Sequence, residues 1–130
     1  AASEFAKCVD LFYNKVTDKA ILCKITNLEV DANMPKMVDF MNCGLKNLGY
    51  YDEEKKDMKV DKVLEGMAQF GYKKDVEVKE VIAKCKTKFG AEITALDYLT
   101  CLLNDEKTWK EFKMLIMITE ADFMKQNFCS

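Results

Sequence analysis

Six cysteines constrain this chain more than any other feature of its sequence. They lie at positions 8, 23, 43, 85, 101 and 129, and the two closest, Cys8 and Cys23, are 15 residues apart. Structural zinc sites usually take thiols two to four residues apart, and CxxC redox motifs also need a close pair, so the spacing favours neither. An even number of widely spread cysteines in a small chain is typical of three disulfides formed in an oxidising compartment. Six free, buried cysteines in a cytosolic protein are the alternative.

The composition predicts one globular domain that spans residues 1–130. Hydrophobic residues make up 49% and charged residues 32% of the chain, a balance typical of soluble globular proteins. The net charge of −2 supplies no basic surface, so we expect no nucleic-acid partner. No apolar run approaches the roughly 18 residues of a membrane span. The chain begins AASEFAKC, without a basic stretch and apolar core, so we expect a secreted protein whose signal peptide has been removed.

Helical spacing of apolar residues recurs along the chain, whereas strand signals are scarce. Val78, Val81, Ile82, Cys85 and Phe89 fall on one helix face, and similar stripes lie within 37–48 and 60–70. The expected start signals are Asp18, Asn33 with Pro35, Asp52, Asp105 and Thr119-x-x-Asp122, and the expected end signals are Gly71 and Gly90. These breaks predict about seven helices of roughly 8 to 15 residues.

Short helices with many breaks favour an all-α, irregular globule over a regular four-helix bundle. Such a globule leaves room for an internal apolar cavity, which three disulfides would hold in shape. The chain has eight Met and eight Phe residues, and Met adapts well to irregular cores and to binding surfaces. Ordinary core packing explains these residues equally well.

Several kinds of catalytic chemistry have no candidate residues. The chain has no histidine, and paired cysteines would leave no thiolate nucleophile. Glu53 and Glu54 lie in the charged run YDEEKKDMK, which we expect to be a solvated face. There is no Gly-rich phosphate loop, and DANMPKMVDFMN lacks the central glycine and closing glutamate of an EF-hand. We therefore expect a binding protein that is not an enzyme and holds no cofactor or metal ion.

Five stretches carry a resemblance to a known family. They are KCVDLFYNKVTDKAILCKI, VDFMNCGLKNLGYYDE, IAKCKTKFG, LTCLLND and the cysteine near the C-terminus, and a TWKEF helix follows the fifth cysteine. Together they resemble insect odorant-binding proteins, and in particular the D-seven salivary proteins of blood-feeding flies. The likeness covers nearly the whole chain. It implies one secreted helical domain, residues 1–130, around an apolar cavity.

The resemblance also implies a disulfide pairing. Common odorant-binding proteins have a CxxxC pair in the third helix, but Asp39 stands at the first of those positions here and only Cys43 is present. Cys23 and Cys129 are additional, as in the D-seven group. The implied pairs are Cys8–Cys43, Cys23–Cys129 and Cys85–Cys101. In the chain-entropy model each is worth roughly 3 to 5 kcal/mol.

A second departure concerns the ligand. The amine-binding D-seven proteins have an acidic pair three residues apart on the helix after the fifth cysteine, and in this chain those positions are Met114 and Met117. Val9, just after the first cysteine, is also apolar at a position where an acidic side chain would help to bind an amine. A buried ammonium needs a partner of opposite charge, so this wall suits an apolar ligand.

These observations predict a monomeric, secreted carrier or scavenger of a small hydrophobic ligand. A fatty acid or eicosanoid is favoured, and a salivary protein of this kind would sequester host lipid mediators. The expected cavity residues are Phe12, Phe40, Met41, Leu64, Met67, Tyr98, Leu102, Phe112, Met114 and Met117. Tyr98 or Lys113 would meet a polar head group. The alternatives are a carrier of an odorant, pheromone or hormone, and a helical protein-binding or cytokine-like factor without a cavity. The many helix breaks argue against the latter.

Overall fold

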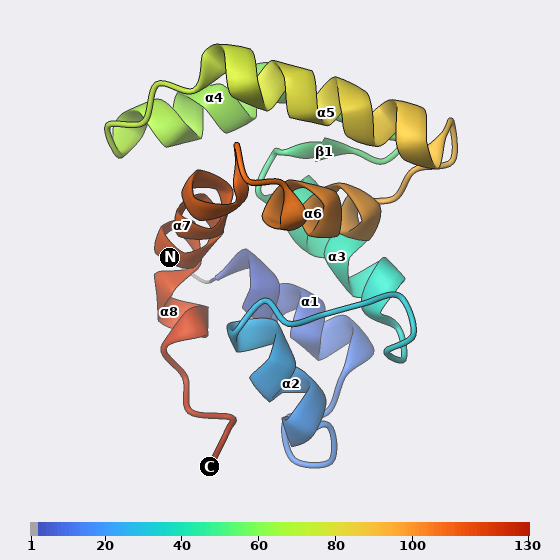
Figure 1. Ribbon diagram of the computed structural model, residues 1–130. Coiled ribbons are helices and arrows are strands. Elements are labelled where there is room, and N and C mark those ends of the chain that lie inside the picture. The colour runs from blue at the N-terminus through green and yellow to red at the C-terminus, as the bar shows by residue number, and fades with distance from the viewer. Residues whose placement is uncertain (1–2) are drawn as a thin grey trace.

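A computed structural model describes residues 3–130 and confirms the all-α fold (Figure 1). Over these residues the helices are α1 (Glu4–Phe12), α2 (Lys19–Thr26), α3 (Met37–Asn47), α4 (Val60–Gln69), α5 (Asp75–Phe89), α6 (Ala95–Asn104), α7 (Trp109–Thr119) and α8 (Ala121–Met124). The described residues thus form eight helices, where the sequence predicted about seven.

The apolar stripes of the sequence become the buried faces of α3, α4 and α5. On α5 the buried residues are Val78, Val81, Ile82 and Cys85, while Phe89, the last residue of the helix, is 39% exposed. Gly71 and Gly90 follow the ends of α4 and α5 with φ of +84° and +83°, as predicted for residues that terminate helices.

The helix starts were predicted less well than the ends. Asp18 is the N-cap residue of α2, but its side chain makes no cap hydrogen bond. The expected capping box at Thr119 and Asp122 is wrong, since Glu120 precedes α8. A capping box does begin α6, where the Thr94 hydroxyl accepts from the Asp97 N–H at 3.1 Å and the Asp97 carboxylate accepts from the Thr94 N–H at 3.0 Å.

The charged run after Gly49 forms a small hairpin, and Glu53 and Glu54 in this run are exposed, as predicted for a solvated face. β1 (Tyr51–Asp52) pairs antiparallel with β2 (Asp57–Met58), and Tyr51 lies opposite Met58. These two side chains are buried, whereas the charged residues between them make the turn. The Asp52 carboxylate accepts hydrogen bonds from the backbone N–H groups of Glu54 and Lys55, so it closes this turn and caps no helix.

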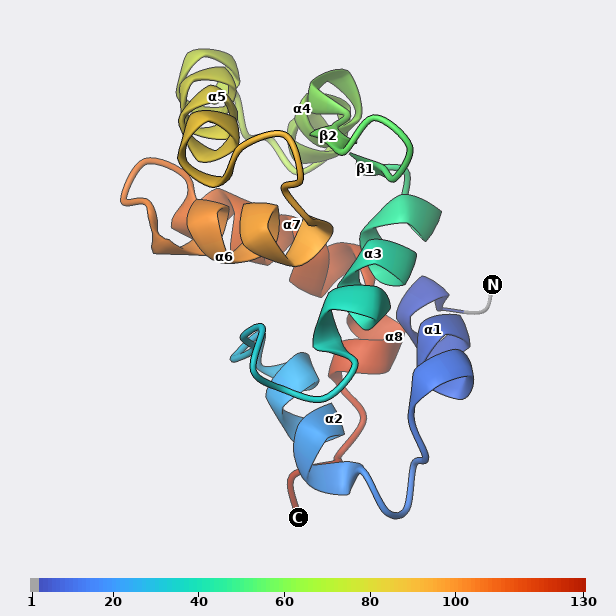
Figure 2. The same ribbon diagram turned by 90° about the vertical axis from the view of Figure 1, so that its right-hand side faces the viewer.

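The elements pack around one hydrophobic core. In Figures 1 and 2, α4 and α5 lie together at one end of the molecule, α6 and α7 lie beneath them, and α1, α2 and α8 form the other end. The helix α3 contacts both α1 and α6, and so connects the two ends. At the crossing of α1 and α3 the ring of Phe5 packs directly against Gly44, since a Cβ added to Gly44 would lie 2.7 Å from Cε1 of Phe5.

Three disulfides join elements that are distant in sequence, and they confirm the predicted pairing. Cys8–Cys43 joins α1 to α3, Cys23–Cys129 joins α2 to the C-terminal segment, and Cys85–Cys101 joins α5 to α6. No cysteine of the described residues is free. Between residues 3 and 130, none of the helices has the length and apolar character that crossing a bilayer requires.

Candidate functional site

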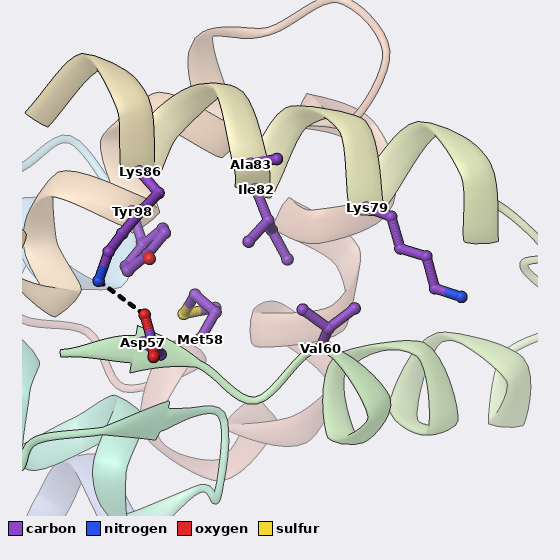
Figure 3. Close-up of a pocket in the computed structure, with 8 residues that line it drawn as sticks. All are labelled: Asp57, Met58, Val60, Lys79, Ile82, Ala83, Lys86 and Tyr98. Atoms are coloured by element: carbon purple, nitrogen blue, oxygen red, sulfur yellow. Dashed lines mark hydrogen bonds and ion pairs between the residues drawn. The ribbon is translucent and has the colours of Figure 1, made fainter. Parts of the chain in front are cut away.

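A groove with a volume of about 330 Å³ lies between α5 and the chain that leads from β2 into α4 (Figure 3). Its size falls at the lower end of the range of about 300 to 1,000 Å³ for small-ligand sites. The residues that line it are Asp57, Met58, Val60, Lys79, Ile82, Ala83, Lys86 and Tyr98.

One wall of the groove is a single stripe along α5. Lys79, Ile82, Ala83 and Lys86 are spaced i, i+3, i+4 and i+7, so their side chains leave the same face of the helix. The first and last of them are two helical turns apart, about 10 Å along the axis. This wall therefore presents an apolar middle with a lysine at each end.

The opposite wall supplies further apolar surface. Met58 at the end of β2 and Val60 at the start of α4 face the α5 stripe across the groove (Figure 3). Met58 and Ile82 are 5% and 7% exposed, and Val60 is half-buried. Each CH₂ group that a ligand buries on such surfaces is worth about 0.8 kcal/mol. The middle of the groove thus favours a hydrocarbon chain.

The end at Lys86 holds a defined polar cluster. Its Nζ donates to Oδ1 of Asp57 at 2.6 Å and to the backbone carbonyl of Lys56 at 3.0 Å. The hydrogen bond to Asp57 is the main cause that raises the pKa of Lys86, so this lysine is charged at neutral pH. Tyr98 lies at the same end, and burial raises the pKa of its hydroxyl, which therefore stays protonated. Two hydrogen-bond donors meet at this end.

The end at Lys79 is open to water. Lys79 is exposed, and none of the ion pairs formed within residues 3–130 includes it. The lining contains two lysines and one aspartate, which gives the groove a formal charge of +1. An anionic or neutral amphiphile suits this charge better than a cation does.

Of the ten residues expected to contact a ligand, Tyr98 is in this groove. Phe40, Met41, Met67, Leu102 and Phe112 are fully buried in the core, and Leu64 and Met117 pack partly buried against it. Phe12 lines a separate surface hollow beside α1 and α3, and Met114 is 38% exposed on α7. Lys113, the other expected head-group residue, is exposed on α7. Ligand contact by these residues, and the internal cavity itself, stay predictions.

The sequence analysis did not predict most of the residues that line the groove, because it considered only the apolar stripe of α5. The signal was present in the spacing of Lys79, Ile82, Ala83 and Lys86, where two lysines bracket an apolar pair. Nothing in the sequence shows that Asp57 and Met58 lie opposite this stripe, since that depends on the hairpin. Among residues 3–130, no group of three His, Cys, Asp or Glu side chains is arranged to hold a metal ion.

Comparison with known proteins gives one family match and two relatives. The model of the PBP/GOBP family matches residues 2–105. The chain is 45% identical over 130 residues to the short form salivary protein D7S1 of Aedes aegypti, an alignment that covers all of this chain and 86% of that protein. It is 29% identical over 114 residues to the long form salivary protein D7L1 of Aedes albopictus, which covers 85% of this chain and 33% of that protein.

Proposed function

The chain belongs to the PBP/GOBP family, and from this premise we propose that it is a secreted carrier or scavenger of a small hydrophobic ligand. Membership of this family supports a binding protein and not an enzyme. The ligand class that we favour is a fatty acid or an eicosanoid, bound with its hydrocarbon chain in the groove between α5 and the chain that leads from β2 into α4.

The observation that carries this proposal is the groove's combination of apolar walls with a net positive charge. Met58, Val60, Ile82 and Ala83 offer a surface for methylene groups, and lysines stand at both ends. Each methylene that the groove buries contributes about 0.8 kcal/mol before ordering costs, so a dissociation constant near micromolar needs the equivalent of about ten buried methylenes. A chain longer than the groove extends beyond it or displaces flexible side chains such as that of Met58.

Secretion and a salivary role have separate support. Three disulfides are typical of proteins that fold in an oxidising compartment, and both relatives are named as salivary proteins. In saliva the mechanism is stoichiometric: a monomeric protein binds a lipid mediator of the host and lowers its free concentration.

A groove-filling variant tests where the ligand binds. Ala83 is exposed and lines the groove, so Ala83→Trp fills it without disturbing the core. Ala20 is also an exposed helical alanine, but it lies on α2 at the other end of the molecule (Figure 1). We expect calorimetry on delipidated protein to show arachidonate binding that Ala83→Trp weakens at least about tenfold and Ala20→Trp leaves unchanged. Equal affinities for both variants would place the ligand outside the groove.

A further inference from the structure

We propose that Lys86 binds the carboxylate head group of the ligand, and that this carboxylate takes the place that Asp57 occupies in the present structure. This inference rests on the proposed function, because it assigns the head-group end of the same groove. The ligand is then an amphiphile with a free carboxylate. Asp57 competes with that carboxylate for the ammonium group of Lys86.

The surroundings of Lys86 fit an anion site. An ammonium group has three N–H donors, and the hydrogen bonds to Asp57 and to the Lys56 carbonyl use two of them. These contacts hold the ammonium at the end of the groove, where the Lys86 side chain is 35% exposed. Tyr98 adds a hydroxyl at the same end. A carboxylate placed here receives charge-assisted hydrogen bonds from donors that are already in position.

Asp57 is suited to exchange with a ligand. Its side chain is 51% exposed and stands at the start of the two-residue strand β2, so its carboxylate can turn into water. An ion pair that is exposed to this degree contributes little to stability. A ligand carboxylate makes the same contact with Lys86, and the hydrocarbon chain attached to it gains burial against Met58 and Ile82. The exchange therefore favours the amphiphile over the aspartate.

The other lysines near the groove are weaker candidates. Lys79 is exposed, and no second hydrogen-bond donor of the lining stands beside it in Figure 3. An ion pair made there is screened by water and salt. Its positive charge still attracts an anion toward the groove. Lys113, which the sequence suggested, does not line the groove.

The test compares two ligands and two variants on the full disulfide-bonded chain. Arachidonate and arachidonyl alcohol share one hydrocarbon chain, so the difference in their affinities isolates the head group. Lys86→Gln and Asp57→Asn both break the ion pair between β2 and α5. Damage to the fold lowers acid affinity in both variants, whereas competition for Lys86 moves the two in opposite directions.

We expect wild type to bind the acid about tenfold more tightly than the alcohol. Lys86→Gln should remove that difference, and Asp57→Asn should strengthen acid binding about threefold or more while alcohol binding stays the same. Equal affinities of wild type for acid and alcohol, or weaker acid binding by both variants, would overturn the head-group assignment and leave the proposed function standing. If neither compound binds wild type, both proposals are wrong.

Discussion

The carboxylate of Glu120 accepts a hydrogen bond from the backbone N–H of Phe5 at 2.8 Å, which joins the junction of α7 and α8 to the first turn of α1. The same carboxylate accepts from the Ser3 hydroxyl and from the Glu4 N–H at 3.3 Å. Glu120 is 3% exposed. The free N–H groups at the start of α1 are thus satisfied by a side chain from the far end of the sequence, and its negative charge also favours that helix end.

Replacing Glu120 with alanine should lower the free energy of unfolding by about 2 to 3 kcal/mol, because buried donors lose a charged acceptor. Denaturant unfolding with the disulfides intact measures this loss. Asp122→Ala is the matched control, since Asp122 is exposed on α8 and its one ion pair within residues 3–130 is with the exposed Lys125. Equal stabilities of the two variants would contradict a capping role for Glu120.

Gly44→Ala should destabilise the protein although alanine favours helices by up to about 1 kcal/mol over glycine. The added methyl group would lie 2.7 Å from Cε1 of Phe5, whose ring is fully buried and packs edge-on against Phe40 and Phe123. Overpacking of this kind costs about 1 to 3 kcal/mol. Thermal unfolding checks the sign, and a raised melting temperature would show that α1 moves away from α3 at little cost.

The three disulfides should differ in their contribution to stability. Their sequence separations are 16, 35 and 106 residues for Cys85–Cys101, Cys8–Cys43 and Cys23–Cys129. The chain-entropy model assigns them about 3, 4 and 5 kcal/mol in that order. Serine pairs at each bridge, compared by denaturant unfolding, test the order. If removing Cys23–Cys129 lowers the free energy of unfolding least of the three, native contacts and not loop length determine these contributions.

Stability should fall in alkaline solution as the buried tyrosines ionise. Burial is the main cause that raises the pKa of Tyr51 from 10.0 to about 12, and its hydroxyl donates to the carbonyl of Ile93 at 2.9 Å. The folded state therefore holds this proton more tightly than the unfolded state. Its contribution is fully present below pH 10 and is lost as the pH rises toward 12.

A tyrosinate absorbance titration of wild type and Tyr51→Phe measures this effect. The variant should lack one late-titrating group, and its stability should depend less on pH in that range. Tyr72 is half-buried and its hydroxyl makes no hydrogen bond within residues 3–130, so Tyr72→Phe is the control variant. Loss of an early-titrating group in Tyr51→Phe would contradict the burial of its hydroxyl.

The sequence predicted most of the helices and the presence of three disulfides. The helices follow from apolar periodicity along the chain, and the disulfides follow from the number and spacing of the cysteines. The stripe from Val78 to Cys85 repeats over several turns, and glycine at positions 71 and 90 has a local conformational reason to end a helix. The choice of which cysteines pair could not be made from local sequence. It followed from the resemblance in cysteine spacing, since six cysteines alone allow 15 pairings.

The groove was mostly beyond sequence reasoning. Its polar end brings Asp57 of a two-residue strand to Lys86 of α5, and such short strands give no alternation pattern. The charged run from residue 51 to residue 59 predicted a solvated face. Within it, however, Tyr51 and Met58 lie opposite each other on β1 and β2, and both side chains are buried. Tyr98 was among the residues expected to contact the ligand and it does line the groove, but its contact with a ligand stays a prediction.

We expect this protein to bind hydrophobic acids and not to bind amines. The groove carries a net positive charge, and its one carboxylate, Asp57, is already paired with Lys86. Calorimetry with arachidonate and with serotonin, on the same delipidated protein at neutral pH, tests the claim most directly. We expect micromolar or tighter binding of arachidonate and no heat of binding with serotonin; heat with serotonin and none with arachidonate would contradict the account.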